Sequence, residues 1–136
     1  MMPAVESPEV ESWYRFLIGS LAVVAARPDE LITSWLDAHR FDIDDVVLDF
    51  ECAVGPLVHL VEVGRVTEEI ASLLRRITAA FDELSRAENA GRWTDEALAT
   101  DPAWAEVRDL ARRSLHGLTG QRQVPLPQID RGTGRT

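Results

Sequence analysis

The sequence contains no lysine. All 14 basic residues are arginine, and they stand against 23 aspartates and glutamates, which gives 136 residues a formal net charge of -9. Binding to nucleic acid needs a basic stripe that neutralises phosphates, so the composition argues against that class of function. An acidic protein is instead attracted to basic protein surfaces. The absence of lysine beside abundant Ala, Val and Arg is typical of a high-GC bacterium.

Cysteine is nearly absent as well. Cys52 is the only one, which excludes an internal disulfide and fits a reducing, cytoplasmic environment. We expect its side chain to be buried as a small apolar group.

Long hydrophobic runs are also missing. The longest, "FLIGSLAVVAA" at 16–26, has eleven residues, whereas a helix that spans a bilayer needs roughly 20. The preceding residues carry three glutamates and one arginine, the wrong charge for a signal peptide. We therefore expect a core helix and a cytoplasmic protein without a membrane contact.

Apolar periodicity and capping residues predict helices along most of the chain. Thr67, Thr94 and Asp101 are expected N-caps, the last followed by Pro102 at the first helical position. The predicted helical segments are 10–26, 28–40, 41–61, 67–84, a short turn after Thr94, and 102–118.

The stretch "FDIDDVVLDFECAVGP" at 41–56 holds five carboxylates and no basic residue. Its apolar residues continue with helical spacing into the following segment, although the β-branched content leaves short strands at 46–50 and 57–63 as an alternative. Gly55-Pro56 should kink or end this helix. The expected inner face comprises Ile43, Val46, Val47, Phe50, Val54, Leu57, Val58 and Val61.

These segments predict an all-α fold, a single-domain bundle of five or six helices with short connections. Residues 1–9 form a flexible lead-in, 10–119 the helical bundle, and 120–136 a tail that is disordered or draped on the surface. The four tryptophans are expected mainly as packing anchors: Trp13, Trp35, Trp93 and Trp104.

No catalytic, metal or cofactor site is predicted. A calcium-binding loop that starts at Asp42 would need glycine at its sixth position and glutamate at its twelfth, where Val47 and Ala53 stand. The histidines, His39, His59 and His116, lack metal-ligand spacing, and His59 is expected in the core or at an interface.

The acidic stretch is instead interpreted as a binding surface for a basic protein. On a helix, Asp42, Asp45 and Asp49 line one edge of the apolar stripe, while Asp44 and Glu51 lie on the other side. Acids near a helix start also stabilise the helix, which explains Asp42, Asp44 and Asp45 without any function. The predicted partner-binding residues are Asp42, Asp45, Asp49 and Glu51.

The segment "RWTDEALATDPAWAEVRDLARRSLHGL", together with the acidic helix and "GRVTEEIASLLRRI" before it, resembles small, acidic, all-α bacterial immunity proteins of polymorphic and contact-dependent toxin systems. The resemblance covers about 41–118. It implies a cytoplasmic protein that masks the basic cleft of a cognate toxin domain, and it assigns no individual contact residue.

The leading hypothesis is thus a non-enzymatic, immunity-type protein that neutralises a toxin through an acidic helical face. One alternative is a divergent metal-dependent all-α nucleotide hydrolase, which would hold magnesium with paired carboxylates. The other is a homodimeric structural protein that associates through the helix from Trp13 to Ala26.

Overall fold

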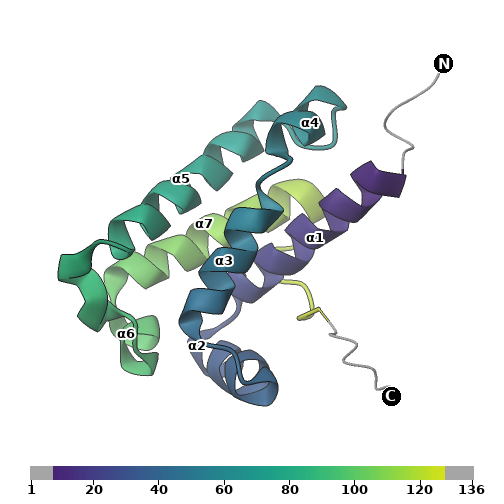
Figure 1. Ribbon diagram of the computed structural model, residues 1–136. Helices are drawn as coiled ribbons and strands as arrows, with labels where there is room; N and C mark the ends of the chain where they lie inside the picture. The colour runs from purple at the N-terminus through teal and green to yellow at the C-terminus, as the bar shows by residue number, and fades with distance from the viewer. Residues whose placement is uncertain (1–7, 128–136) are drawn as a thin grey trace.

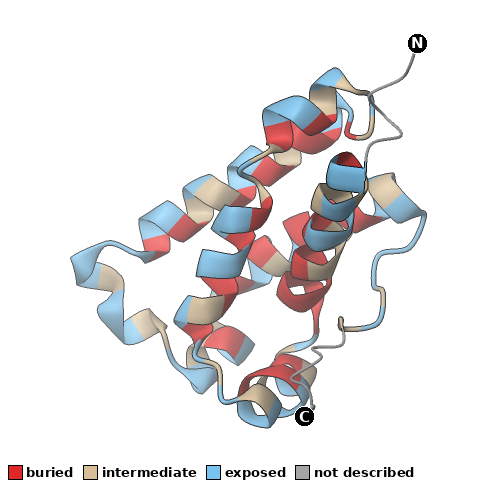
Figure 2. Ribbon diagram, turned by 45° about the vertical axis from the view of Figure 1, so that its right-hand side comes forward, coloured by how far each residue is buried: buried red, intermediate tan, exposed pale blue. Residues whose placement is uncertain are grey.

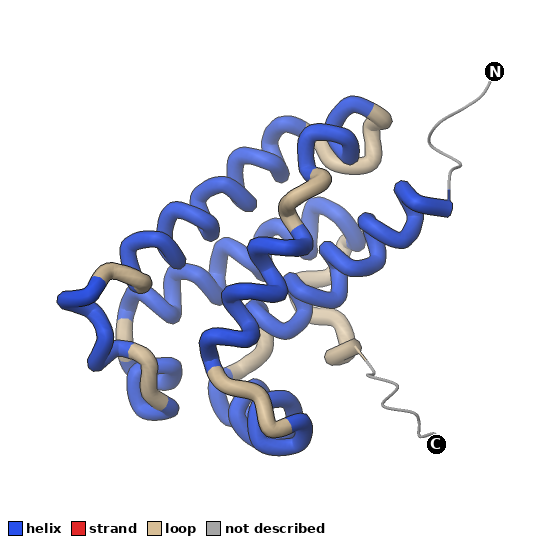
Figure 3. The backbone as a smooth tube through the Cα atoms, in the orientation of Figure 1, coloured by secondary structure: helices blue, strands red, loops and turns tan. Residues whose placement is uncertain are grey.

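The computed structural model describes residues 8–127, and Figures 1 and 3 show an all-helical arrangement. This part of the chain contains no strand, so the helical interpretation of 46–50 and 57–63 is confirmed. The elements are α1 (Pro8–Ala25), α2 (Pro28–Glu30), the π-helical η2 (Leu31–Asp37), α3 (Ile43–Ala53), α4 (Leu57–Glu62), α5 (Glu68–Leu84), the 3-10 turn η3 (Ala87–Arg92), α6 (Asp95–Thr100) and α7 (Pro102–Thr119).

Helix α7 is the centre of the packing. It lies against both α1 and α5, and α3 in turn packs on α1 (Figure 1). Buried residues line the sides of these helices that face one another (Figure 2). Phe50 of α3 meets Phe81 of α5 edge to face at 5.5 Å between ring centroids, and Phe81 contacts Trp104 of α7. The all-α single-domain fold is therefore confirmed.

The predicted helix starts are confirmed by side-chain caps. The Thr67 hydroxyl accepts a hydrogen bond from Ile70 N at 3.2 Å, and the Thr94 hydroxyl accepts one from Ala97 N at 3.0 Å. Asp101 caps α7 by accepting from the N–H two residues later. Each bond satisfies a backbone donor that the first helical turn leaves without a partner.

Gly55-Pro56 ends a helix instead of kinking one. Helix α3 stops at Ala53, and α4 begins at Leu57 after a turn. The break changes the rotation of the chain, so the predicted inner face is wrong at Val58. Leu57 is buried as predicted, and Val54 and Val61 pack against the core. Val58 is 62% exposed, whereas Leu60 is fully buried.

The predicted helix 28–40 contains a π-helical segment and ends one residue early. Arg40 has a φ of 58°, a left-handed conformation. The N–H of Phe41 donates to Leu36 O at 2.8 Å, and that of Arg40 donates to Asp37 O at 3.4 Å. These two bonds form a Schellman motif in which arginine occupies the position that usually carries glycine.

Two expectations about burial are wrong. Cys52 is exposed, because it lies on the outer side of α3, away from the apolar stripe. Phe16, the first residue of the apolar run 16–26 for which a core helix is expected, is 46% exposed. Of the tryptophans, Trp35 and Trp104 are buried, while Trp13 and Trp93 are half-buried and pack against the core.

The segment after α7 lies over the bundle. Gly120 ends the helix, and the coil that follows places Val124 and Leu126 against the core and Pro127 beside Gly19 of α1. The lead-in up to residue 7 and the tail from 128 onward lie outside the described residues. Within the described part of the chain, no helix has both the length and the apolar character to cross a bilayer.

Candidate binding surface

Helix α3 turns its apolar side to the core and its carboxylates away from it. Its buried residues all fall within one arc of the helix. Within that arc, Phe50 packs on α5 and Val46 faces α1. The carboxylates occupy the remaining arc. Asp42, Asp44, Asp49 and Glu51 are exposed, and Asp45 is half-buried.

Two of the four predicted binding residues also build the start of α3. Asp42 is the N-cap, and its backbone N–H donates to Asp45 Oδ2 at 2.8 Å. This is the reciprocal bond of a capping box, in which the third helical residue reaches back to the cap. The structural role foreseen for the first acids of this stretch is therefore present.

The other two, Asp49 and Glu51, lie at opposite edges of the exposed arc. Successive residues of a helix are about 100° apart, so two positions separate their directions by about 200°. Asp49 lines a pocket against α1, and Glu51 is exposed at the opposite edge. The predicted residues thus wrap around α3 and do not form one compact patch.

None of the five carboxylates from Asp42 to Glu51 forms an ion pair within residues 8–127. Other carboxylates do find arginines. Glu11 lies 2.6 Å from Arg65, and Asp101 lies 2.6 Å from Arg92. Hydrogen bonds from Arg92 and from a backbone N–H lower the pKa of Asp101 to about 2. The acidic charge of α3 has by contrast no counter-charge among the residues that the structure describes.

Two further carboxylates join the start of α3 in a shallow concavity of about 350 Å³, here called the acidic concavity. Asp37 comes from η2 and Asp95 from α6, and they line it with Asp42 and Asp44. The half-buried Trp93 forms part of its wall. Asp37 and Asp95 were not among the predicted residues, because they belong to segments that only the fold brings to α3.

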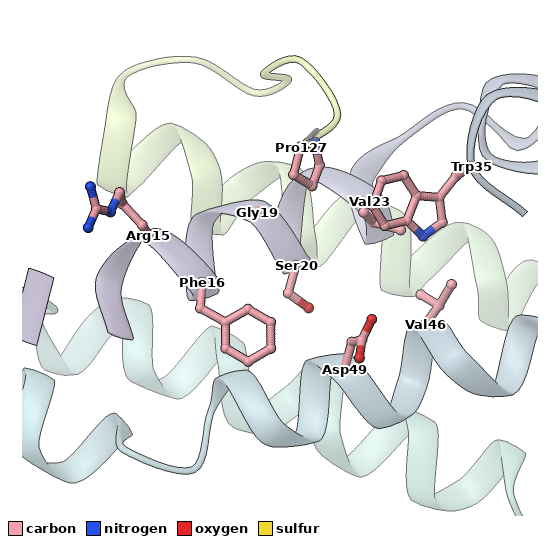
Figure 4. Close-up of a pocket in the computed structure, with 9 residues that line it drawn as sticks. All are labelled: Arg15, Phe16, Gly19, Ser20, Val23, Trp35, Val46, Asp49 and Pro127. Atoms are coloured by element: carbon pink, nitrogen blue, oxygen red, sulfur yellow. The ribbon is translucent and has the colours of Figure 1, made fainter. Parts of the chain in front are cut away.

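A second concavity, here called the α1–α3 pocket, lies further along α3, between it and α1, and has a volume of about 240 Å³. It is largely apolar (Figure 4). Burial, and then the negative charge of Asp45, raise the pKa of Asp49 at its edge. It is lined by Arg15, Phe16, Gly19, Ser20 and Val23 of α1, Trp35 of η2, Val46 and Asp49 of α3, and Pro127 of the coil after α7.

In the described part of the chain, no three His, Cys, Asp or Glu residues are placed so that they could hold a metal ion. His59 does not lie in the core, because its side chain is 64% exposed. It stacks on Trp13 at 5.7 Å and lies 3.7 Å from a carboxylate oxygen of Glu62.

Comparisons with protein-family models, with curated proteins and with solved structures find no match for this chain. The functional proposal therefore depends on the residues of α3 and its flanks.

Proposed function

We propose that this chain is a non-enzymatic, cytoplasmic binding protein of the immunity type, which neutralises a basic partner such as a toxin domain. The observation that carries the proposal is the set of five carboxylates on and before α3 that have no ion-pair partner within residues 8–127, on a chain of net charge -9. An unbalanced acidic surface speeds encounter with a basic protein and disfavours acidic ones.

The acidic concavity is the part of this surface best suited to the side chains of a partner. Carboxylates from η2, α3 and α6 surround it, so a single arginine or lysine would meet several of them at once. Arginine pairs with carboxylates through two parallel hydrogen bonds, which adds geometric specificity to the attraction. The half-buried ring of Trp93 supplies an aromatic wall of the kind found at binding hot spots.

Capture from the source cell with immobilised full-length protein tests the proposal. One variant replaces Asp45, Asp49 and Glu51 with Asn, Asn and Gln, and a second replaces Asp37, Asp44 and Asp95 with Asn. The control replaces Glu69, Asp82 and Glu96 with Gln, Asn and Gln, three exposed acids on α5 and α6 that form no ion pair within residues 8–127. All three variants change the net charge by the same amount.

We expect the wild type and the control to retain the same basic protein, and one or both surface variants to lose it. The affinity of the purified pair should fall as salt is raised, since screening shortens the range of the charge attraction to about 8 Å at physiological ionic strength. Equal recovery of the partner by the wild type and by both surface variants would refute the acidic surface as the binding site.

A further inference from the structure

Three polar groups of the α1–α3 pocket have no hydrogen-bond or ion-pair partner within the described chain. Ser20 is 6% exposed and Trp35 is 4% exposed, yet neither the hydroxyl nor the indole N–H makes a hydrogen bond there. The indole N–H groups of Trp93 and Trp104 each donate to a backbone carbonyl at 2.8 Å. The third group is the carboxylate of Asp49.

These groups are directed into one space. Figure 4 shows the Ser20 hydroxyl and the Asp49 carboxylate reaching toward each other from α1 and α3, and the nitrogen of Trp35 on the edge of its ring that faces α3. Buried donors and acceptors without partners, here the Ser20 hydroxyl and the Trp35 indole N–H, are rare in folded proteins and call for a specific explanation. A bound molecule that hydrogen-bonds to both of them and pairs with the exposed carboxylate of Asp49 would account for them.

We propose that the α1–α3 pocket binds a small organic amine that carries a hydroxyl or carbonyl oxygen next to its ammonium-bearing carbon. The ammonium donates to Asp49, and the oxygen accepts from the Trp35 N–H and the Ser20 hydroxyl. The apolar part of the molecule fills the space beside Phe16, Val23 and Val46.

Charge favours a cation at the Asp49 end of the pocket. Asp49 lies near Asp45, and no arginine pairs with either carboxylate in the described chain. Arg15, the basic residue of the lining, extends away from the pocket in Figure 4. An ammonium group would therefore relieve the repulsion between two neighbouring carboxylates.

The volume sets the size of the molecule. An apolar cavity of roughly 150 Å³ accommodates benzene, so about 240 Å³ has room for a six-membered ring and a short polar chain. The largely apolar lining with a few convergent polar groups is the usual character of small-molecule sites. This inference does not depend on the proposed partner, although both involve Asp49.

Titration of the full-length protein with four related compounds tests the proposal by calorimetry and by the NMR signals of the indole N–H groups. Phenylethanolamine carries both polar groups, phenethylamine only the ammonium, phenylethanol only the hydroxyl, and phenylpropanoate a negative charge. Phenylethanolamine should bind most tightly. Phenethylamine and phenylethanol should each bind about tenfold more weakly, because each lacks one hydrogen-bonded contact. Phenylpropanoate should show no measurable binding. The Trp35 indole proton should move with the two hydroxyl compounds only.

Two variants assign the contacts. Asp49→Asn should weaken the two amines about tenfold and leave phenylethanol unchanged, since it removes only the negative charge. Ser20→Ala should weaken phenylethanolamine and phenylethanol. Glu51→Gln is the matched control, because it removes one charge from the opposite edge of α3 and should leave the affinity for the four compounds unchanged.

Absence of binding by all four compounds would overturn the proposal, as would equal affinity for the amine and the anion. An equal loss of amine affinity in the Asp49→Asn and Glu51→Gln variants would also overturn it, because the attraction would then be a general effect of net charge.

Discussion

At the scale of single residues, the unusual feature is the polar content of an otherwise apolar pocket. Ser20 lies on the buried side of α1 without a hydrogen bond inside the described chain, whereas the other buried serine, Ser114 of α7, donates to Leu110 O at 2.9 Å. A buried hydroxyl with no partner lowers stability, because its hydrogen bonds to water are lost on folding and no hydrogen bond within the protein replaces them. The two serines therefore provide a matched pair.

We expect Ser20→Ala to raise the free energy of unfolding of the ligand-free protein by about 1–2 kcal/mol, from the removed hydroxyl and the better helix propensity of alanine. Ser114→Ala should change it by less than about 1 kcal/mol, because the gained propensity offsets a lost hydrogen bond. Chemical denaturation measures both. A destabilised Ser20→Ala variant would show that the hydroxyl is satisfied.

Asp49 should make stability depend on pH. Burial and the charge of Asp45 raise its pKa in the folded state above the unfolded value, so the ionised carboxylate disfavours folding. At low pH the carboxyl is protonated in both states, and Asp49 then has no unfavourable effect on folding. The wild type loses stability as pH rises through the folded-state pKa of Asp49. We expect Asp49→Asn to be more stable than the wild type at neutral pH and this advantage to vanish below about pH 4. Thermal unfolding from pH 3 to 7 measures it, and an advantage that grows toward low pH would contradict the assignment.

At the scale of elements, the chain shows how helix ends are made with different residues. Helix α7 ends at Gly120, whose φ of 85° suits glycine, whereas the segment from Pro28 ends at Arg40 with a φ of 58°. A side chain in this left-handed region crowds the following carbonyl oxygen, at a cost of about 1–2 kcal/mol per residue. The Schellman bonds after Leu36 hold the arginine there.

Replacing Arg40 with glycine should therefore stabilise the protein. We expect Arg40→Gly to raise the free energy of unfolding by about 1 kcal/mol, since the strain relieved exceeds the added freedom of the unfolded chain. Arg40→Ala is the control, because it removes the same charge and keeps the strain. A glycine variant no more stable than the alanine variant in chemical denaturation would show that the residue is not strained.

At the scale of the whole molecule, α3 connects the core to the acidic surface. Phe50 is fully buried against α5, and Leu48, two residues earlier, is 57% exposed. The same short helix thus contributes to the packing that holds the bundle together and presents the carboxylates that we propose as the binding surface.

The orientation of α3 predicts a large contrast between its two sides. We expect Phe50→Ala to lower the free energy of unfolding by about 3–5 kcal/mol through lost burial and a cavity. Leu48→Ala should change it by no more than about 0.5 kcal/mol, as is usual for surface positions. Urea denaturation compares them. Similar losses in both variants would mean that Leu48 is also covered, for example by a second copy of the chain.

Helix positions were predictable because their determinants are local. The caps at Thr67, Thr94 and Asp101 act within three residues, and the apolar period of 43–50 correctly separates the inner side of α3 from the outer. The same period failed at Val58, because the turn at Gly55-Pro56 changes the direction in which the side chains of α4 point. The size of that change cannot be read from residue spacing.

Burial at Phe16 and Cys52 could not be predicted for a related reason. An apolar side chain is buried only where another element covers it, and neighbouring helices leave the outer side of α3 and part of α1 uncovered. Periodicity tells which residues share a face but not how wide the covered face is.

The sequence by itself determined the helical class, the starts of its main helices and the excess of negative charge, since each depends on composition or on residues a few positions apart. Only the tertiary structure decided which charges act together. It brought Asp37 and Asp95 to the start of α3 and set Asp49 opposite Ser20 and Trp35. These residues belong to separate helices, and only packing of the apolar faces brings them together.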